Sequence, residues 1–566
     1  MESQRGKLLS EEPLLENLIE GTSEKIVEIK GVEHHTADSW RACIYILVTE
    51  CFEELAYYGI QFNLVTFLKT VLHENNVTAA RNYTNWQGTC YIAPLVGAII
   101  ADSYLGRYLT TVAFFTVYLV GMAAMSISAS FPTCAGPDCL QDGSSKSFVF
   151  FLGLYMMAIG AGGMKPCVLS FGADQFDDSS PAERLKKDSF FNWFFFAIYI
   201  GSFVSGTVVV WAQDHFGWVV GLWIPTLFIA LAIASFVLGS SSYTVQKPMG
   251  SPIVRAFQVI VAAIRKWDVR LPNDDSLLHE LLQEKASMAD GDKLQHTPVL
   301  RFLDKAAVIS SAEELADPWR LCTVTQVQEL KVIIGMLPIW ATGIVYFAVL
   351  AQFSSTFLEQ GRTMDKVVGA FAIPPASLAS FDAVSVIFWV PIYDKVLVPA
   401  ARRLTGRERG LSELQRFGTG LILSVLVMTA AALVETRRLA LAAAHGEGEV
   451  PMSILWQVPQ YFLIGASVVF ACVGQTEFFY NEAPASMRSL CSALGLLAVA
   501  LGSYLSSLVV TAVAWLTTRG GEPGWIPDDL NDGHLDRFFW LLAALSSLNL
   551  AVFVCCARQY RRKSAY

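Results

Sequence analysis

Three glutamates lie inside the first long apolar stretch of this 566-residue chain. Glu50, Glu53 and Glu54 are followed by Tyr57 and Tyr58, and on a helix these five positions share one face. A carboxylate in hydrocarbon is costly unless it is protonated, paired or in contact with water. The cluster therefore predicts a water-filled pathway for protons or solutes. The alternative, an exposed helix end, is disfavoured because apolar residues precede and follow the acids.

A basic residue in another apolar stretch is the expected partner of these acids. Lys165 is the only cation in that stretch and follows glycines in Gly160-Ala-Gly-Gly-Met-Lys-Pro166. Glycines allow close helix contact, and a proline lets the helix bend beside the charge. The alternative is a lysine that extends to the membrane surface.

The surrounding elements are those of an all-α membrane protein. Hydrophobic residues make up 53% of the chain and charged residues only 16%, whereas soluble proteins carry roughly a quarter charged residues. Apolar segments of about twenty residues predict about twelve spans. The spans lie near 41–68, 85–104, 108–129, 147–173, 190–211, 217–239, 329–357, 374–397, 413–435, 453–480, 488–516 and 536–557.

The spans divide six and six around a polar central segment. We expect an N-terminal tail (1–40), a first bundle (41–240), a central loop with some amphipathic helix (241–328), a second bundle (329–557) and a C-terminal tail (558–566). The loops rich in arginine and lysine predict that the central loop and both termini are cytoplasmic. Arg437 and Arg438, on the opposite side, run against this rule.

Several features concern processing and location. Asn76 and Asn82 begin glycosylation sequons in a loop that this topology places outside the cytoplasm. Cys134 and Cys139 pair if their polar loop faces an oxidising compartment, whereas the other nine of the eleven cysteines are expected to be small core residues. The membrane is expected to be the plasma membrane or the vacuolar membrane.

Motifs along nearly the whole chain resemble those of the proton-coupled oligopeptide transporter family of the major facilitator superfamily, in its plant nitrate and peptide transporter branch. The similarity is greatest to the peptide-transporting members of that branch. The motifs are Tyr57-Tyr-Gly59, Gly97-Ala-Ile-Ile-Ala-Asp-Ser-Tyr-Leu-Gly-Arg107, Lys165-Pro-Cys-Val-Leu-Ser-Phe-Gly-Ala-Asp-Gln-Phe176, Ser189-Phe-Phe-Asn-Trp193, Trp319-Arg-Leu-Cys-Thr-Val-Thr-Gln326, Trp456-Gln-Val-Pro-Gln460, Ala483-Pro484 with Met487-Arg-Ser489, and Asn531-Asp-Gly-His-Leu-Asp536.

This resemblance implies the major facilitator fold of two six-helix bundles, with proton coupling at Glu50, Glu53 and Lys165. It also shows three departures from the family pattern. Glu54 stands where the family has a basic residue, Tyr199 where it has a peptide-contacting asparagine, and Val468 where it has the glutamate that binds the peptide amino terminus.

These departures have physical consequences. Three carboxylates at helical spacing are expensive to ionise together, and Lys165 has lost its usual tenth-span partner. We therefore expect Lys165 to pair with Glu53 or Glu54. The ammonium group of a bound peptide likewise lacks its usual counter-charge, because Val468 replaces the glutamate. The extra acids of the first span could pair with this ammonium group instead. Nitrate is disfavoured because the cavity is acidic and Leu350 occupies the position of a histidine in nitrate-transporting relatives.

Further polar residues in apolar spans are candidates for the substrate cavity. They are Gln352, Asp382 and Glu477, which we expect to join Tyr57, Tyr58, Lys165, Tyr199 and Val468 there. For Gln352 an equal alternative is hydrogen bonding between helices. Asp102 and Arg107 are expected to latch the two bundles as a gate, the alternative being a plain helix cap.

The function predicted is proton-coupled transport of dipeptides, tripeptides or related amine-bearing solutes. One alternative is the same fold with altered proton coupling that carries another organic solute or nitrate, and another is a transport-inactive membrane sensor. An enzyme is not expected, because the cytoplasmic segments show no metal cluster, nucleophile constellation or phosphate loop. The expected partners are the substrate, protons and the lipid bilayer, with no cofactor, metal or nucleic acid; the oligomeric state is left open.

Overall fold

The computed structural model describes most of the chain, as fourteen continuous ranges and three isolated residues. The described residues are 39–74, 76–130, 139–177, 180–246, 248, 250–271, 278–279, 297, 299–310, 314, 317–368, 371–372, 379–406, 410–445, 450–518, 524–527 and 529–564.

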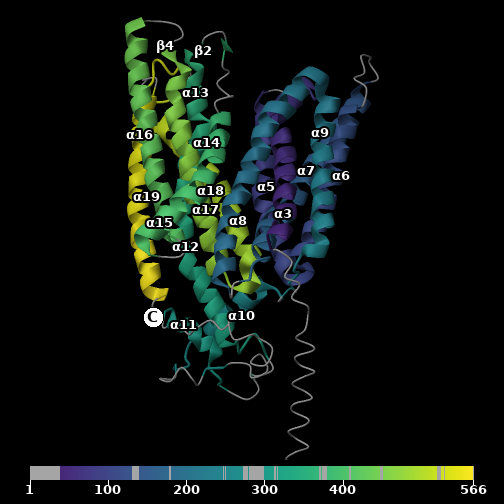
Figure 1. Cartoon of the computed structure of the whole chain (residues 1–566), viewed down its shortest axis with the longest axis vertical. Coiled ribbons are helices and arrows are strands. Elements are labelled where there is room, and N and C mark those ends of the chain that lie inside the picture. The colour runs from purple at the N-terminus through teal and green to yellow at the C-terminus, as the bar shows by residue number, and fades with distance from the viewer. Residues whose placement is uncertain are drawn as a thin grey trace, which may run out of the picture.

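The N-terminal half consists of long helices that pack around their own apolar core (Figure 1). In chain order they are α3 (Ser39–Gln61), the short α4 (Leu64–Thr70), α5 (Asn76–Ile100), α6 (Gly106–Ser130), α7 (Cys139–Ala173), α8 (Pro181–Val204) and α9 (Val210–Leu238). Short π-helical turns, η1 (Ala101–Leu105) and η2 (Ser205–Val209), join α5 to α6 and α8 to α9.

The C-terminal half repeats this arrangement with two apolar clusters of its own. Its helices are α12 (Val324–Leu350), the short α13 (Thr356–Arg362), α14 (Ala379–Ile392), α15 (Val398–Thr405), α16 (Glu413–His445), α17 (Val458–Glu482), α18 (Arg488–Thr517) and α19 (Leu535–Ser564). The π-helical turn η10 (Tyr393–Leu397) joins α14 to α15.

Four short strands lie at one end of the C-terminal half. Strand β1 (Met364–Asp365) pairs in parallel with β4 (Val450–Ser453), with Met364 opposite Val450. Strand β2 (Val367–Val368) pairs antiparallel with β3 (Phe371–Ala372).

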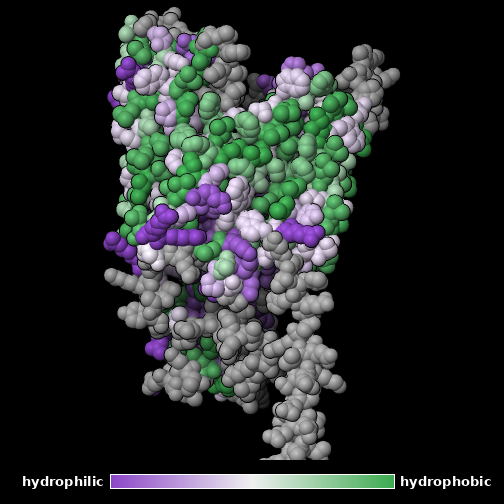
Figure 2. Space-filling view, viewed as in Figure 1, coloured by the Kyte–Doolittle hydropathy of each residue, from purple (hydrophilic) through white to green (hydrophobic). Residues whose placement is uncertain are grey.

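The long helices have the dimensions and composition of membrane spans. Within the described residues, nine stretches are long and apolar enough to cross a membrane. Two of these stretches, 82–130 and 181–242, contain two helices each, and α3 is an additional long helix made less apolar by its three glutamates. About twelve spans result. Figure 2 shows the apolar band that they form across the visible face, with hydrophilic residues below it.

The central segment packs at one end of both bundles, here named the α10 end (Figure 1). It contains α10 (Pro252–Arg265) and the single turn α11 (Arg301–Asp304). The buried face of α10 packs on α11 and on the start of α12, through Val259, Ala262 and Ala263. Ion pairs fix this contact, among them Lys331–Asp304 at 2.6 Å and Arg255–Glu329 at 2.7 Å.

Several predicted boundaries differ from the structure; α16, for example, continues past the expected end at 435 to His445. The expected span at 329–357 begins earlier, at Val324, because Thr323 and Gln326 form a reciprocal capping box at the start of α12. The side chain of Thr323 accepts a hydrogen bond from the Gln326 amide at 3.2 Å. The helix therefore extends beyond its apolar part into the central segment.

The structure also explains the arginine that ran against the positive-inside rule. Arg438 is fully buried and forms an ion pair with Glu435 at 2.6 Å. Its second nitrogen donates to Asn531 at 2.6 Å, and Gln360 donates to Glu435 at 2.8 Å. Because its charge is neutralised inside the bundle, Arg438 does not act as a loop charge that sets orientation.

Candidate functional site: a buried charge cluster and two interbundle contacts

Lys165 on α7 contacts two glutamates of α3 at once. Its Nζ lies 3.0 Å from Glu53 Oε2 and 2.6 Å from Glu54 Oε1. The predicted pairing with the acids of the first helix is therefore present, and it involves both candidates. Glu50 completes the cluster, because one carboxylate oxygen from each of the three glutamates lies within 4.8 Å of the others.

The cluster is buried and carries more negative than positive charge. The exposed fractions of Glu50, Glu53 and Glu54 are 3%, 0% and 6%. Glu50 Oε2 and Glu53 Oε1 have no hydrogen-bond partner among the described residues. When all groups are ionised, one ammonium faces three carboxylates, which is unfavourable in a low-dielectric setting.

Close helix packing holds the cluster in place. Gly162, three residues before Lys165, is so close to α5 that a Cβ there would lie 2.3 Å from the Cβ of Ala93. On the other side, a Cβ at Gly201 of α8 would lie 2.6 Å from the Cys51 carbonyl of α3. The Tyr57 ring lies 4.6 Å from Lys165 Nζ and stacks on Trp86. These contacts fix the lysine against α3.

The C-terminal half contributes another buried carboxylate. Asp382, near the start of α14, is 6% exposed, and its Oδ1 has no hydrogen-bond partner among the described residues. Tyr58 and Tyr199 are within electrostatic reach of Asp382. Helices α8 and α14 are in contact, so these side chains come from both halves of the molecule.

The remaining predicted cavity residues have different surroundings. Val468 is 2% exposed and belongs to the apolar core of the C-terminal half. Gln352 is fully buried and donates to Ser506 of α18 at 2.7 Å, which matches the alternative of hydrogen bonding between helices. Glu477 lies in an ion pair with Arg416 at 2.8 Å, lining a cavity that does not include the α3 glutamates.

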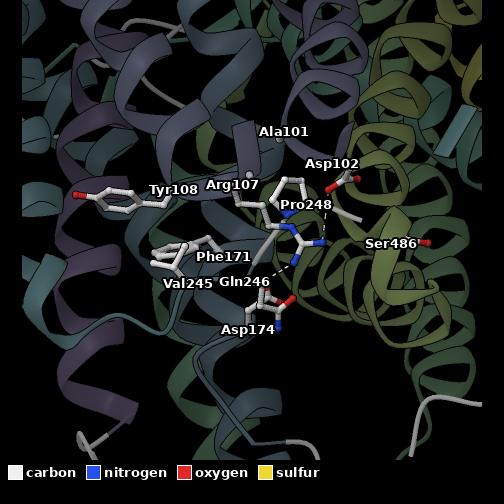
Figure 3. A pocket seen from close by; sticks show the side chains of 11 residues that line it. Ala101, Asp102, Arg107, Tyr108, Phe171, Asp174, Val245, Gln246, Pro248 and Ser486 are labelled. Carbon is white, nitrogen blue, oxygen red and sulfur yellow. Dashed lines mark hydrogen bonds and ion pairs between the residues drawn. The ribbon is translucent and has the colours of Figure 1, made fainter. Parts of the chain in front are cut away.

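Asp102 and Arg107 lie at the α10 end, where they contact the C-terminal half. Arg107 donates to Asp174 and lies 3.5 Å from Asp102 (Figure 3). Across the interface, Arg107 Nε donates to Ser489 at 2.9 Å and the Leu490 amide donates to Asp102 at 3.1 Å. We name these residues, with Tyr480 and Arg488, which also bond Asp174, the first interbundle contact.

A second interbundle contact lies at the start of α16. The buried Arg416 pairs with Glu477 of α17 and donates to Asn192 of α8. Asn192 in turn donates to Asp394 at 3.2 Å. Since α8 belongs to the N-terminal half and the other residues to the C-terminal half, these four residues join the two bundles.

The two contacts correspond to each other in the internal repeat. Asp102 is the second residue of the π-helical turn η1, and Asp394 is the second residue of the π-helical turn η10. Arg107, in the first turn of α6, pairs with Asp174 directly after the end of α7, and Arg416, in the first turn of α16, pairs with Glu477 near the end of α17. The C-terminal half differs in that α15 lies between η10 and α16. Each arginine also donates to a residue of the opposite half.

The structure describes the predicted glycosylation sequons but only one residue of the predicted cysteine pair. Asn82 is half-buried in α5 and donates to the Glu74 carboxylate at 2.9 Å; Asn76 begins the same helix. Cys134 lies outside the described residues, so its pairing with Cys139 stays a prediction. The only metal-like grouping found among the described residues is the three α3 glutamates, two of which already bind Lys165.

Sequence reasoning missed several residues of the interbundle contacts. Asp174, Arg488 and Ser489 stood in quoted motifs without an assigned role, and Asn192, Asp394 and Arg416 received none. Their partners are 61 to 382 residues away in the chain. The spacing gave no signal for the second contact, because α15 separates Asp394 from Arg416.

Comparisons with known proteins agree with this architecture. A sequence model of the POT family matches residues 108–526. Protein NRT1/PTR FAMILY 8.3 of Arabidopsis thaliana is 53% identical over 540 residues, covering 93% of this chain and 92% of the relative. Protein NRT1/PTR FAMILY 8.1 of the same plant is 51% identical over 539 residues, covering 93% and 95%.

Solved structures show the same fold at lower identity. The POT family transporter PepTSo superposes with a TM-score of 0.59 at 22% identity, over 92% of this chain and 99% of that one. A POT family transporter in complex with 5-aminolevulinic acid gives a TM-score of 0.58 at 15% identity, over 92% and 96%. The chain therefore belongs to the POT family of membrane transporters, and it is not an enzyme.

Proposed function

We propose that this protein is a proton-coupled carrier of small amine-bearing solutes, with dipeptides and tripeptides as the first candidates, and that it works by alternating access. The observation that carries the proposal is the buried cluster in which Lys165 is shared by Glu53 and Glu54 beside Glu50.

The proton has a physical place in this cluster. When all three buried carboxylates are ionised beside one ammonium, the cluster has excess negative charge. A proton on one carboxylate removes part of this excess and requires little change in the surrounding structure. Lys165 can then remain with the carboxylate that stays ionised. Proton uptake and release thus change how firmly α3 and α7 are held together.

Asp382 is the proposed counter-charge for the substrate amine. Burying an ammonium without a partner costs several kcal/mol, and Val468 offers it only apolar surface. Asp382 is buried, lies on the half opposite the charge cluster and has a carboxylate oxygen without a hydrogen-bond partner among the described residues. A solute bound there would contact both halves, which couples its binding to their movement.

The interbundle contacts supply the gate. Both lie at the α10 end, which the basic loops predict to be cytoplasmic, and in Figure 1 the two halves diverge toward the opposite end. This arrangement corresponds to a carrier closed toward the cytoplasm. Opening toward the cytoplasm requires both contacts to break.

The names of related proteins support small amine-bearing solutes. One similar solved structure is described as a peptide transporter, and another holds 5-aminolevulinic acid, which carries an amine and a carboxylate. The plant relatives bear the names of the nitrate and peptide branch. The excess of acids in the cluster favours a cationic group over nitrate.

The test is uptake of a labelled dipeptide into oocytes that express the chain, at acidic and neutral external pH, with membrane current recorded. Uptake is expected to rise at acidic pH and to carry inward current. Asp382→Asn is expected to raise the apparent KM about tenfold to a hundredfold, as for loss of a hydrogen bond to a charged group. The exposed Asp268→Asn is the matched control and should leave KM unchanged.

The departures at Glu54 and Val468 favour one second candidate, a carrier with altered proton coupling for another organic solute. Uptake that is independent of pH and electrically silent would support this candidate instead. If no solute is taken up while the protein reaches the membrane, a transport-inactive sensor is the better account.

A further inference from the structure

The second interbundle contact borders a cavity that no step of the proposed transport uses. Its volume is about 280 Å³, and it is lined by α8 on one side and by η10, α15 and the start of α16 on the other. A water molecule takes up about 30 Å³ in the liquid, so the space admits a tetrahedral oxyanion. Its walls come from both halves of the molecule.

Two arginines in the wall have donor capacity that the described residues do not satisfy. The Nε atoms of Arg402 and Arg416 are buried and have no hydrogen-bond partner among these residues. Arg416 is otherwise fully engaged with Glu477, Asn192 and the Val469 carbonyl. Arg402 of α15 has no ion-pair partner within the described part of the chain.

The acids that line the same cavity have partners other than Arg402. Glu477 pairs with Arg416, and Asp394 pairs with Lys395 at 3.1 Å. Glu413 accepts from Asn481 at 3.1 Å, and Asp188 interacts with other groups. Four acids and three cations line the cavity. Arg402 is the cation among them that has no ion-pair partner within the described part of the chain, and its Nε donor is unused there.

The geometry points to an oxyanion-binding site at Arg402, for a phosphate or carboxylate group. A guanidinium matches such groups because its parallel N–H bonds meet two oxygens at once. Since α8 forms one wall and α15 the other, an anion bound there stabilises the state in which the α10 ends of the two halves are together. The site would thus regulate opening rather than carry the transported solute.

The oxyanion can come from two sources, a free anion or the headgroup phosphate of a membrane lipid. The two are separated with the purified full-length protein in nanodiscs. One arm titrates inorganic phosphate into phosphatidylcholine nanodiscs at constant ionic strength, with chloride as the reference salt. The other arm replaces part of the lipid with phosphatidylinositol 4-phosphate and adds no phosphate. The readout in both arms is the shift in thermal unfolding temperature.

We expect a saturable upward shift in at least one arm and at least a tenfold loss of apparent affinity in Arg402→Gln. Arg403→Gln, which removes the neighbouring exposed charge on the same helix, should keep the shift. A shift with phosphate identifies a free anion, and a shift only with the phosphoinositide identifies a lipid headgroup. Arg402→Lys keeps the positive charge but loses the planar guanidinium, so it should show intermediate affinity. This variant replaces Arg402→Gln in the test if Arg402→Gln fails to fold.

Three results would overturn the site: no saturable shift in either arm, a shift that Arg402→Gln and Arg402→Lys both retain in full, or an equal loss in Arg403→Gln. This test requires no transport. Its failure therefore leaves the proposed carrier function intact, and a failed uptake assay leaves this site intact.

Discussion

Lys165 forms ion pairs with two buried carboxylates at the same time, and its removal should be the most damaging single charge change in the N-terminal half. In Lys165→Ala, Glu53 and Glu54 stay buried without a cation, which costs about 3–5 kcal/mol of folding free energy. We expect dipeptide uptake to be lost and the thermal unfolding temperature to fall.

A compensated variant separates folding from transport at this position. Lys165→Ala combined with Glu53→Gln and Glu54→Gln removes the unpaired charges, so stability should return while uptake stays absent. Normal uptake in Lys165→Ala alone would contradict the pairing as a functional element. Unfolding temperature in detergent and uptake in oocytes measure the two effects.

At this scale, the sequence supported some residue assignments and not others. The pairing of Lys165 followed from a single cation in one apolar helix and three glutamates in another, because such charges have few other partners in a membrane. Glu477 was assigned to the substrate cavity because it is a polar residue in an apolar span, and its partner Arg416, 61 residues away, was not foreseen. For a buried acid in a span, the sequence gives the need for a partner but not its identity.

At the scale of the helices, glycine contacts decide how closely α5, α6 and α7 approach the charge cluster. A Cβ at Gly162 would meet Ala93 of α5, and one at Gly163 would meet the Phe114 ring of α6. By contrast, a Cβ at Gly495 of α18 meets no atom within 4 Å.

These contacts give a matched pair of variants. Gly162→Ala overfills the α5–α7 contact and should destabilise the protein by about 1–3 kcal/mol, with reduced uptake because Lys165 is displaced. Gly495→Ala adds the same methyl group to open space and should be neutral or stabilising by up to about 1 kcal/mol. Equal unfolding temperatures for the two variants would contradict close packing at Gly162.

Helix existence was predictable because apolar length is a strong signal, whereas some boundaries and partners were not. The start of α12 at Val324 depends on a capping box, which lies in a polar stretch that periodicity assigns to a loop. The buried Arg438 appeared as a loop charge because its helix, α16, continues beyond the expected span to His445.

At the scale of the whole molecule, orientation in the membrane is still a prediction, and glycosylation tests it. If the start of α5 faces away from the cytoplasm, Asn76 or Asn82, which lie in its first two turns, should carry a glycan in a plant or yeast membrane. An endoglycosidase should then increase gel mobility in the wild type and have no effect on the Asn76→Gln, Asn82→Gln double variant. If the wild type carries no glycan and this segment is accessible from the cytoplasmic side, the orientation is the reverse of the one predicted.

The arrangement of two six-helix halves was expected from twelve spans and a polar centre, and the POT family membership fits it. Asp102 and Arg107 were expected to latch the two halves, but their partners across the interface were not predicted, since these lie far away in the chain. Ser170 of α7 and Ser492 of α18 illustrate this, with hydroxyl oxygens 2.8 Å apart across the interface.

That serine pair offers the most direct test of the central claim, that the two halves separate at the α10 end in every transport cycle. In the double variant Ser170→Cys, Ser492→Cys, the two thiols should form a disulfide under mild oxidation, because the serine side chains that they replace already lie within hydrogen-bonding distance of each other. Dipeptide uptake should then stop and return on reduction, while each single variant transports normally under both conditions. Unchanged uptake in the fully cross-linked double variant would contradict alternating access through these contacts.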